Sequence, residues 1–428
     1  GAALAEVMEN KPYKLSELVA LIQEKCDIPA VGTSGLKPIF EYEAAYEQWQ
    51  QRISSHHIQT AELRAGRQEV FLGIDSGSTT TKIVVTDELA RVLFSYYNRN
   101  SGNPIQAVEE GLNRLRETCR RKGAELVIKG SCSTGYGEEL IKSAFQLHAG
   151  IIETIAHYMA AHYLDEKVSF ILDIGGQDMK AIFVNNGVID RIDINEACSS
   201  GCGSFIETFA KTLNYTVHDF ALAACRAQAP CDLGTRCTVF MNSKVKQALR
   251  EGATVSDIAA GLAYSVVKNC LYKVLKIKDV SVLGKHIVVQ GGTMRNDAVV
   301  RVIERLAEVE VSRCDMPELM GAFGCALYAM SHTGVAVSLD EIIGKAHYTS
   351  RFLYCKGCAN NCMVVRYLFD NGKKYYSGNK CEKVYSNGAA DSVKGQNVYQ
   401  LKNQLLFDRN VDVEHATLTV GIPRCLNM

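Results

Sequence analysis

The sequence has 428 residues, which is too long for one ordinary hydrophobic core, so two or three domains are expected. Its 47% hydrophobic and 22% charged residues are typical of a globular protein and exclude a mainly disordered chain. The 47 Lys and Arg residues balance the 47 Asp and Glu residues, so net charge gives no basis for expecting a nucleic acid or an anionic membrane as partner.

Sixteen cysteines occur without a signal peptide, and no apolar run approaches the ~18 residues of a membrane span. Metal or redox chemistry in a reducing cytoplasm is therefore favoured over a disulfide framework. The chain does not begin with Met, and we expect a fragment of a longer polypeptide. Gly1–Ala5 resembles the stretch from Gly321 to Ala329, which suggests the tail of an earlier copy of the following domain.

Residues 69–86 predict two strands joined by a turn of Gly, Ser and Thr. Packed N–H donors and hydroxyls in such a turn bind phosphate, and an aspartate at the strand end holds Mg²⁺ through water. Most Gly-rich turns only join two strands of a hairpin and bind no ligand. The Asp-X-Gly-X-Thr pattern followed by a lysine favours a nucleotide here, with these candidate positions: Asp75, Gly77, Ser78, Thr79 and Lys82.

Helices are expected over 106–122 and 153–164, with a strand over 125–130 between them; His157 is interpreted as an ordinary helix residue. Residues 168–183 then repeat the order strand, acid, glycine turn, strand. Two such hairpins facing across a cleft would clamp the phosphates and Mg²⁺ of ATP. The second contributes Asp173, Gly175, Gly176, Gln177 and Asp178.

A third strand, over 285–290, ends in Gly291 and Gly292, where a flat adenine or ribose can approach the backbone closely. A helix over 298–306 is expected to follow.

Two cysteines, Cys198 and Cys237, each precede a helical pattern. A helix N-terminus has unpaired N–H groups and a partial positive charge, which favour a thiolate or an anionic cluster bound to it. The alternative is that both are buried apolar side chains, the commonest fate of a free thiol. Spacing alone does not decide between these interpretations.

Beyond a connector at Ser338–Gly344, four cysteines follow the spacing C-x2-C-x3-C…C, with a hairpin expected at Asn371–Gly372. Four thiolates in this pattern fit zinc or a [4Fe-4S] cluster, although the first two alone would also fit a redox pair. The four are Cys355, Cys358, Cys362 and Cys381.

The three glycine motifs in this order resemble the actin-like ATPase superfamily, which implies a duplicated α/β, ribonuclease H-like fold. Within it, Asp173–Asp178, Cys198 followed by glycines, and Cys237–Phe240 resemble the ATP-dependent activators of 2-hydroxyacyl-CoA dehydratases and the ATPase subunits of benzoyl-CoA reductase. The likeness extends over residues 70–332.

The resemblance implies that two lobes share one [4Fe-4S] cluster, with Cys198 and Cys237 as this lobe's ligands. ATP turnover would change the angle between the two cluster helices and send a low-potential electron into an iron–sulfur dehydratase or reductase acting on an acyl-CoA or similar substrate. The electron donor would be ferredoxin or flavodoxin, and the second lobe would come from a homodimer or from the same longer chain. Cys202, Cys225 and Cys231 are additional and leave another cluster arrangement open.

The resemblance also assigns roles in the ATP site: Mg²⁺ held through water by Asp75 and Asp173, phosphate contacts from Ser78, Thr79 and Lys82, and the attacking water positioned by Gln177 or Asp178.

The expected organisation resembles that of long fused activase-related proteins of anaerobes. Its parts are a preceding lobe's end with a helical linker (1–69), the ATPase domain (70–332), a linker with a cysteine-rich metal-binding segment (333–415), and the start of a further, dehydratase-like domain (416–428). Two alternatives remain: a small-molecule kinase of the same superfamily, in which Cys198 and Cys237 are core residues, and a nucleotide-dependent scaffold with a structural zinc.

Overall fold

The computed structural model describes residues 14–16, 19, 36–195, 202–235, 237–378, 381, 384–387, 401, 402, 404 and 405. It divides the chain into two units, Gly1–Tyr348 and Thr349–Met428. Three predictions concern residues outside this described part. They are the tail of an earlier domain copy at Gly1–Ala5, the cluster ligand Cys198, and the start of a further domain at 416–428.

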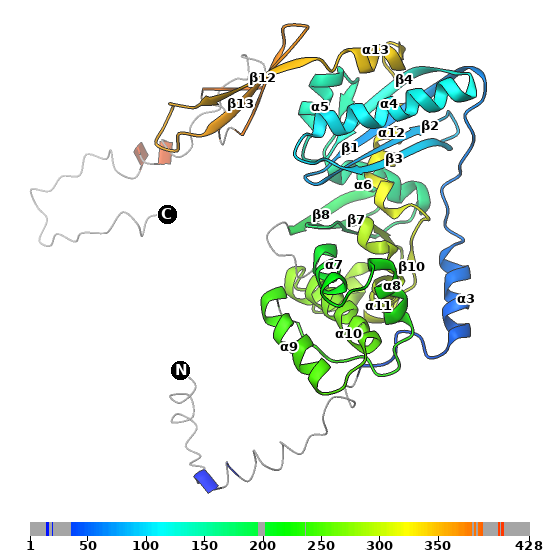
Figure 1. Ribbon diagram of the computed structural model, residues 1–428, viewed down its shortest axis with the longest axis vertical. Coiled ribbons are helices and arrows are strands. Elements are labelled where there is room, and N and C mark those ends of the chain that lie inside the picture. Colours follow the sequence, from blue (N-terminus) through cyan, green and yellow to red (C-terminus); the bar gives the residue numbers. More distant parts are fainter. Residues whose placement is uncertain are drawn as a thin grey trace, which may run out of the picture. The chain divides into compact units, whose positions relative to one another are not determined.

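The first lobe of unit 1 is built on a sheet in the order β11-β4-β1-β2-β3, with β5 beside β4 (Figure 1). Strand β1 pairs antiparallel with β2 and parallel with β4. Its strands are β1 (Gly66–Ser76), β2 (Thr80–Thr86), β3 (Val92–Arg99), β4 (Ala124–Thr134), β5 (Ala149–Gly150) and β11 (Val337–Ser338).

Helices α4 (Pro104–Lys122) and α5 (Glu138–Phe145) pack against this sheet. The Asn103 side chain accepts a hydrogen bond from the N–H of Gln106 and so caps α4, and Gly123 ends the helix at φ +66°.

The second lobe repeats the design with a sheet in the order β10-β9-β6-β7-β8. Here β6 pairs antiparallel with β7 and parallel with β9, as β1 does with β2 and β4. Its strands are β6 (Phe170–Ile174), β7 (Met179–Asn185), β8 (Val188–Asn195), β9 (Ile287–Gln290) and β10 (Val311–Ser312). Its helices include α7 (Gly203–Thr212), α8 (Val217–Cys225), α9 (Thr238–Arg250), α10 (Val255–Lys268) and α11 (Asp297–Ala307).

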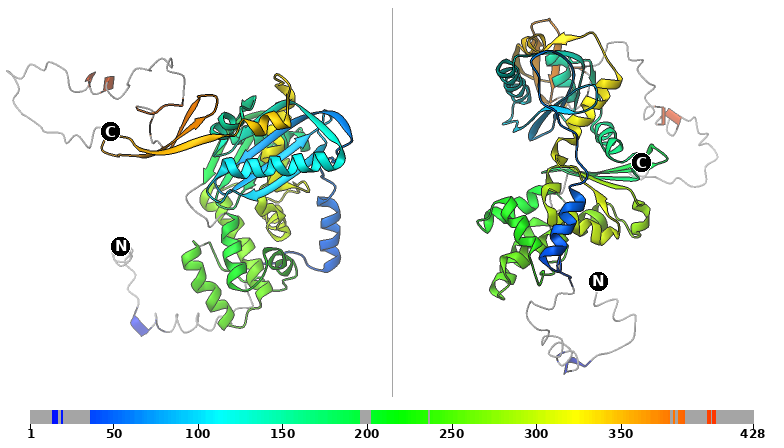
Figure 2. Two further views of the ribbon diagram at one scale, coloured as in Figure 1. Left: turned by 45° about the horizontal axis from the view of Figure 1, so that its top comes forward. Right: turned by 90° about the vertical axis from the view of Figure 1, so that its right-hand side faces the viewer.

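Two helices, α6 (Glu153–Leu164) and α12 (Met320–Ser331), lie between the sheets and join the lobes (Figure 2). Their close packing depends on glycine. A Cβ at Gly324 of α12 would lie 1.8 Å from the carbonyl oxygen of Ala156, and a Cβ at Gly73 of β1 would lie 2.0 Å from the carbonyl oxygen of Ala322. Each lobe is thus fixed against the other through backbone-to-backbone contact.

These features confirm the predicted α/β, duplicated actin-like fold, and both glycine hairpins form in the expected places. The expected connector at Ser338–Gly344 is instead a helix, α13 (Leu339–Gly344). Ser338 and Glu341 form its capping box, a Ser-x-x-Glu signal readable in the sequence. Among the described residues, no helix is both long and apolar enough to cross a membrane.

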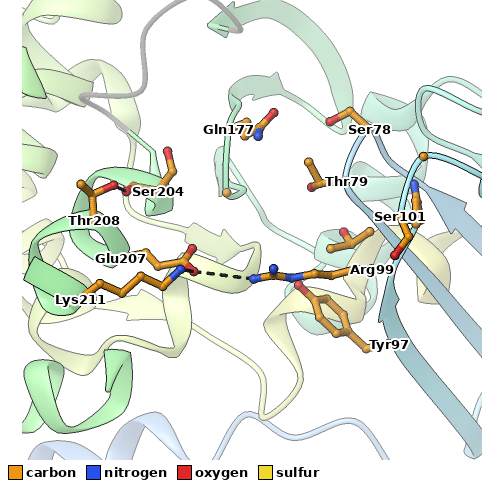
Figure 3. Close-up of a pocket in the computed structure, with 14 residues that line it drawn as sticks. Ser78, Thr79, Tyr97, Arg99, Ser101, Gln177, Ser204, Glu207, Thr208 and Lys211 are labelled. Carbon is orange, nitrogen blue, oxygen red and sulfur yellow. Dashed lines mark hydrogen bonds and ion pairs between the residues drawn. The ribbon is translucent and has the colours of Figure 1, made fainter. Parts of the chain in front are cut away.

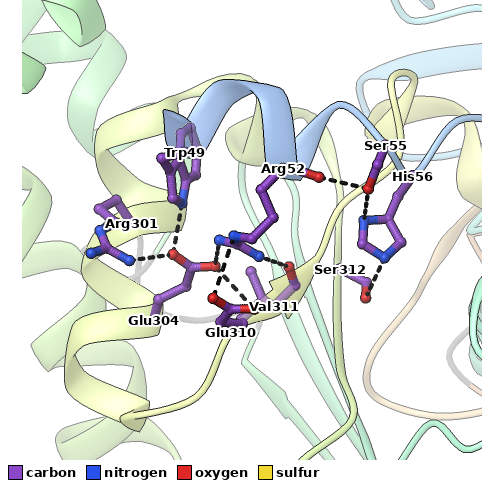
Figure 4. Close-up of polar contacts among 9 residues, drawn as sticks. All are labelled: Trp49, Arg52, Ser55, His56, Arg301, Glu304, Glu310, Val311 and Ser312. Carbon is purple, nitrogen blue, oxygen red and sulfur yellow. Dashed lines mark hydrogen bonds and ion pairs between the residues drawn. The ribbon is translucent and has the colours of Figure 1, made fainter. Parts of the chain in front are cut away.

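Helix α3 (Glu43–Ile53) precedes the first lobe in sequence but packs on the second (Figure 4). The buried carboxylate of Glu304 on α11 accepts hydrogen bonds from Trp49 Nε1 at 2.7 Å and Arg301 Nη1 at 2.8 Å, and also from Arg52. It further accepts the N–H of Val311 at 3.0 Å. One carboxylate therefore ties three elements together.

Unit 2 contains a three-stranded sheet in the order β12-β13-β14. Its strands are β12 (Tyr348–Tyr354), β13 (Met363–Phe369) and β14 (Lys374–Ser377). The turn between β13 and β14 contains the predicted Asn371–Gly372 pair, with Gly372 at φ +78°.

Replacing Glu304 with Gln should lower the free energy of unfolding by about 2–4 kcal/mol, because the two arginines would face a neutral amide in a buried contact. Trp49 is the only tryptophan in the sequence, so its fluorescence during urea unfolding reports on this contact. Glu310→Gln is the matched control: that side chain is 76% exposed and 3.6 Å from Arg52, so the change should stay below about 0.5 kcal/mol. Equal losses in the two variants would contradict the assignment.

Candidate functional site

Each glycine hairpin places an aspartate directly opposite a lysine. Asp75 on β1 pairs in register with Lys82 on β2, and Asp173 on β6 pairs in the same way with Lys180 on β7. Lys82 Nζ donates to Asp75 Oδ2 at 2.8 Å, and Lys180 Nζ lies 3.9 Å from Asp173 Oδ2. The duplication therefore extends from the backbone to a repeated Asp–Lys pair.

The two aspartates approach one another where α6 crosses α12. A Cβ at Gly321 of α12 would lie 2.8 Å from Asp75 Oδ2 and 3.4 Å from His157 Nε2. The His157 Nε2 atom is in turn 3.6 Å from Asp173 Oδ2 and 3.6 Å from Glu153 Oε1. The absence of a side chain at Gly321 leaves room for acids from both lobes.

Buried charges compensate one another in this cluster. Burial raises the pKa of Asp173, although His157 and Lys180 oppose the shift. Burial alone would lower the pKa of His157, but the negative charges of Asp173 and Glu153 raise it to about 9. Burial would raise the pKa of Glu153, yet its contacts with His157 and Lys180 lower it to about 2.

Asp75 and this cluster offer oxygen ligands of the kind that Mg²⁺ prefers. Asp75 Oδ1 is buried and accepts no hydrogen bond in the described part of the structure. Within the same described residues, Glu153, His157 and Asp173 form the one group of three potential ligands whose atoms all lie within 4.8 Å of one another. The carboxylates of Asp75, Glu153 and Asp173 are thus the candidate oxygen ligands for a divalent cation in this region.

A cavity of about 670 Å³ is lined by residues of both lobes, including the turns of the two glycine hairpins (Figure 3). Ser78 and Thr79 from the first hairpin face Gly176 and Gln177 from the second across this space. The first turn is braced by Asn100, whose Nδ2 donates to the carbonyl oxygen of Gly77 at 2.6 Å. Of the predicted phosphate contacts, Ser78 and Thr79 line this cavity, whereas Lys82 is not among the residues that line it.

A second cavity of about 370 Å³ shares Gly176 with the first and is lined by apolar side chains of α7 and α8, including Ile206 and Val217. Gly292 lines it as well. Gly291 has φ +91°, and a Cβ there would lie 2.4 Å from the carbonyl oxygen of Ile174. Only glycine fits that turn, and the next residue, Gly292, lines the cavity.

The two candidates for positioning water differ in their surroundings. Gln177 is exposed and lines the larger cavity. The Asp178 carboxylate instead accepts a hydrogen bond from Lys180, and its Oδ1 would be 2.3 Å from a Cβ at Gly175, so it folds back over its own turn.

The start of α7 is bonded directly to the second hairpin turn. The N–H of Gly203 donates to the carbonyl oxygen of Gly175 at 3.0 Å, and the N–H of Ser204 donates to that of Gly176 at 2.9 Å. Thr293 Oγ1 donates to the same Gly175 oxygen at 3.0 Å. The helix that follows Cys198 in sequence is therefore hydrogen-bonded directly to this turn.

The cysteines of this region fall into two groups. Cys237 is the exposed N-cap residue of α9, so its predicted place at a helix start is confirmed. Cys202, the N-cap residue of α7, is buried, as are Cys225 and Cys231. Burial raises the pKa of Cys225 and raises that of Cys231 to about 11, which is typical of structural thiols.

Sequence reasoning missed Glu153, Lys180 and Gln290 as members of the site and treated His157 as an ordinary helix residue. Gln290 Oε1 is 2.5 Å from His157 Nδ1 and orients the ring. Lys180 was recognisable, because it follows Asp173 by the same interval that separates Lys82 from Asp75. Glu153 and His157 are one turn apart on α6, a spacing too common to indicate a site.

Known proteins resemble the chain over the same region. It is 30% identical over 262 residues to the (R)-2-hydroxyglutaryl-CoA dehydratase activating ATPase of Acidaminococcus fermentans, which covers 60% of this chain and 96% of that protein. It is 31% identical over 259 residues to the 2-hydroxyisocaproyl-CoA dehydratase activator of Clostridioides difficile, covering 60% of this chain and 94% of that protein.

A solved structure agrees with these relatives. The activator of the 2-hydroxyisocaproyl-CoA dehydratase from Clostridium difficile with bound ADPNP superposes with a TM-score of 0.54 at 29% identity, over 61% of this chain and 94% of that one. The sequence model of the BadF/BadG/BcrA/BcrD ATPase family matches residues 72–329. The chain therefore belongs to the BadF/BadG/BcrA/BcrD ATPase family.

Proposed function

We propose that this protein is an ATP-hydrolysing activator that delivers a low-potential electron, through a [4Fe-4S] cluster on Cys198 and Cys237, to an iron–sulfur dehydratase or reductase acting on an acyl-CoA or similar substrate. The observation that carries the proposal is the pair of backbone hydrogen bonds from Gly203 and Ser204 to the hairpin turn at Gly175 and Gly176.

In the ATP site, Asp75 and Asp173 would hold hydrated Mg²⁺, and Ser78, Thr79 and Lys82 would contact phosphate. Lys82 is well suited to this role: burial would lower its pKa, but the adjacent Asp75 raises it, so the side chain stays charged. Gln177, exposed in the cavity, is the better candidate for orienting the attacking water, because Asp178 is occupied by Lys180.

The hydrogen bonds between α7 and the second hairpin support the following coupling step. Loss of the γ-phosphate removes hydrogen-bond acceptors from the hairpin turn, and the turn then relaxes. Because Gly203 and Ser204 are bonded to that turn, α7 moves with it, carrying the chain just after Cys198. The ion pair between Arg99 on β3 and Glu207 on α7, 3.7 Å long, offers a second link across the cavity (Figure 3).

Cys237 suits a ligand of a shared cluster. Its side chain is exposed at the N-terminus of α9, where the helix dipole favours an anionic centre. Phe240, in the same first turn, is 64% exposed and offers an apolar contact for a second lobe. A bound [4Fe-4S] cluster supplies one-electron transfer at low potential.

The named relatives support the downstream step, since proteins similar over most of their length are described as dehydratase activators. A partner of that class, supplied with electrons by a ferredoxin or flavodoxin, is accordingly proposed here. The second lobe is provided by another copy of the chain or by the same polypeptide.

Asp75→Asn should slow ATP hydrolysis by about 100-fold or more, because the cation at the phosphates loses a charged anchor. The measurement is steady-state phosphate release with Mg²⁺, with far-UV circular dichroism as a check on folding. Asp87→Asn, at the far end of β2 where Asp87 pairs with Arg91, is the matched control and should hydrolyse ATP normally. Hydrolysis by Asp75→Asn within about threefold of wild type would refute the site assignment.

Cys237→Ser should remove the shared cluster from protein purified without oxygen. A lost [4Fe-4S] cluster removes about four irons for every pair of lobes, so iron falls by about two per lobe, together with the visible absorption of the cluster. Cys119→Ser, a thiol on α4 in the first lobe, is the control and should keep its iron. The proposed electron transfer is wrong if Cys237→Ser retains the wild-type iron content and spectrum.

A further inference from the structure

We propose a second metal centre in unit 2, in which the thiolates of Cys355, Cys358, Cys362 and Cys381 bind either one zinc ion or an iron–sulfur cluster and hold the small sheet together. This centre is independent of the ATPase function. The family match ends at residue 329, before any of these cysteines.

Three of the thiols come from one closed loop. Strand β12 ends at Tyr354 and β13 begins at Met363, so residues 355–362 connect them. The N–H of Cys355 donates to the carbonyl oxygen of Cys362 at 2.8 Å, which sets these two cysteines opposite each other at the base of the loop.

The tip of the same loop folds back on itself. The N–H of Asn361 donates to the carbonyl oxygen of Cys358 at 3.2 Å, and Asn361 has φ +41°, the left-handed conformation that Asn tolerates well. Cys355 is buried while Cys358 is exposed. A loop closed at its base and turned at its tip presents its three cysteines within a few residues of one another.

The chain beyond β14 returns to this loop and brings the fourth cysteine with it. Tyr376 N–H donates to Asn387 Oδ1 at 2.7 Å, and Asn387 Nδ2 donates to the Tyr376 carbonyl oxygen at 2.7 Å, so the side chain of Asn387 is held against β14. A Cβ at Gly357 would lie 2.5 Å from Val384 Cγ2. Ser377, the last residue of β14, pairs with Val365 near the start of β13, and Cys381 follows it by four residues in sequence, three residues before Val384.

Unit 2 buries too few apolar side chains for packing alone to stabilise its three-stranded sheet. In its described part, the buried hydrophobic side chains are Cys355, Val364 and Phe369, whereas Phe352 is 65% and Met363 is 55% exposed. A three-stranded sheet with so few buried side chains is marginally stable. Binding of a metal by four thiolates supplies the missing folding free energy.

Zinc and an iron–sulfur cluster use the same four thiolates but space them differently. A tetrahedral zinc draws its sulfurs to about 3.8 Å from one another. In the described residues, three or more potential ligands within 4.8 Å of each other are found at Glu153, His157 and Asp173, and not at these cysteines. The loop side chains must therefore turn inward for zinc, whereas a cluster needs a wider spacing.

Metal analysis of the anaerobically purified chain tests the proposal and distinguishes the two metals. Cys358→Ser changes the exposed ligand, which disturbs packing least. The variant should lose about one zinc or about four irons per chain relative to wild type. Lys356→Ser, an exposed non-ligand in the same loop, should lose neither.

Alkylation with iodoacetamide, followed by peptide mass mapping, is the second measurement. In wild type all four thiols should be protected until a chelator is added, and in Cys358→Ser the remaining three should react at once. Equal metal content in wild type and Cys358→Ser, or a metal-free Cys355–Cys358 disulfide in wild type, would overturn the proposal. Cys237→Ser should keep the metal of unit 2, so the two proposed metal centres are tested independently of each other.

Discussion

The arrangement of the second lobe depends on the contact between the turn of its glycine hairpin and the first residues of α7. The N–H groups of Gly203 and Ser204 are donors that a helix start would otherwise leave to solvent, and here the carbonyl oxygens of Gly175 and Gly176 accept them. A Cβ at Gly203 would be 2.4 Å from Thr293 Oγ1. The helix start is therefore confined between the hairpin turn at Gly175 and Gly176 and the short helical turn Gly292–Arg295 that follows β9.

Glycines allow similarly close packing between the two lobes. Glycines let α12 contact β1 and α6 through the backbone. Gly321 also leaves room for Asp75 on one side and, on the other, for the buried cluster of Glu153, His157 and Asp173, called here the His157 cluster. Such a crossing resists small displacements because backbone atoms are already in contact. Motion is more easily accommodated at the cavity rim, where exposed pairs such as Arg99 with Glu207 join the lobes.

Much of this could be predicted from the sequence. The two hairpins and their acids are local patterns, because strand alternation and turn residues specify them over a few positions. The His157 cluster could not be predicted, because it depends on α6, β6, β7 and β9 meeting in space. The helix after Ser338 was missed although its capping box is local. The fold was thus more predictable than the charge network inside it.

The central claim is that the nucleotide state reaches α7 through Gly175 and Gly176. Hydrogen exchange with and without the ATP analogue ADPNP tests this most directly, with Gly203→Ala as comparison. In wild type, the nucleotide should slow exchange at both the hairpin, residues 175–178, and the first turn of α7; in Gly203→Ala it should protect only the hairpin. Protection confined to the hairpin in wild type would contradict the account.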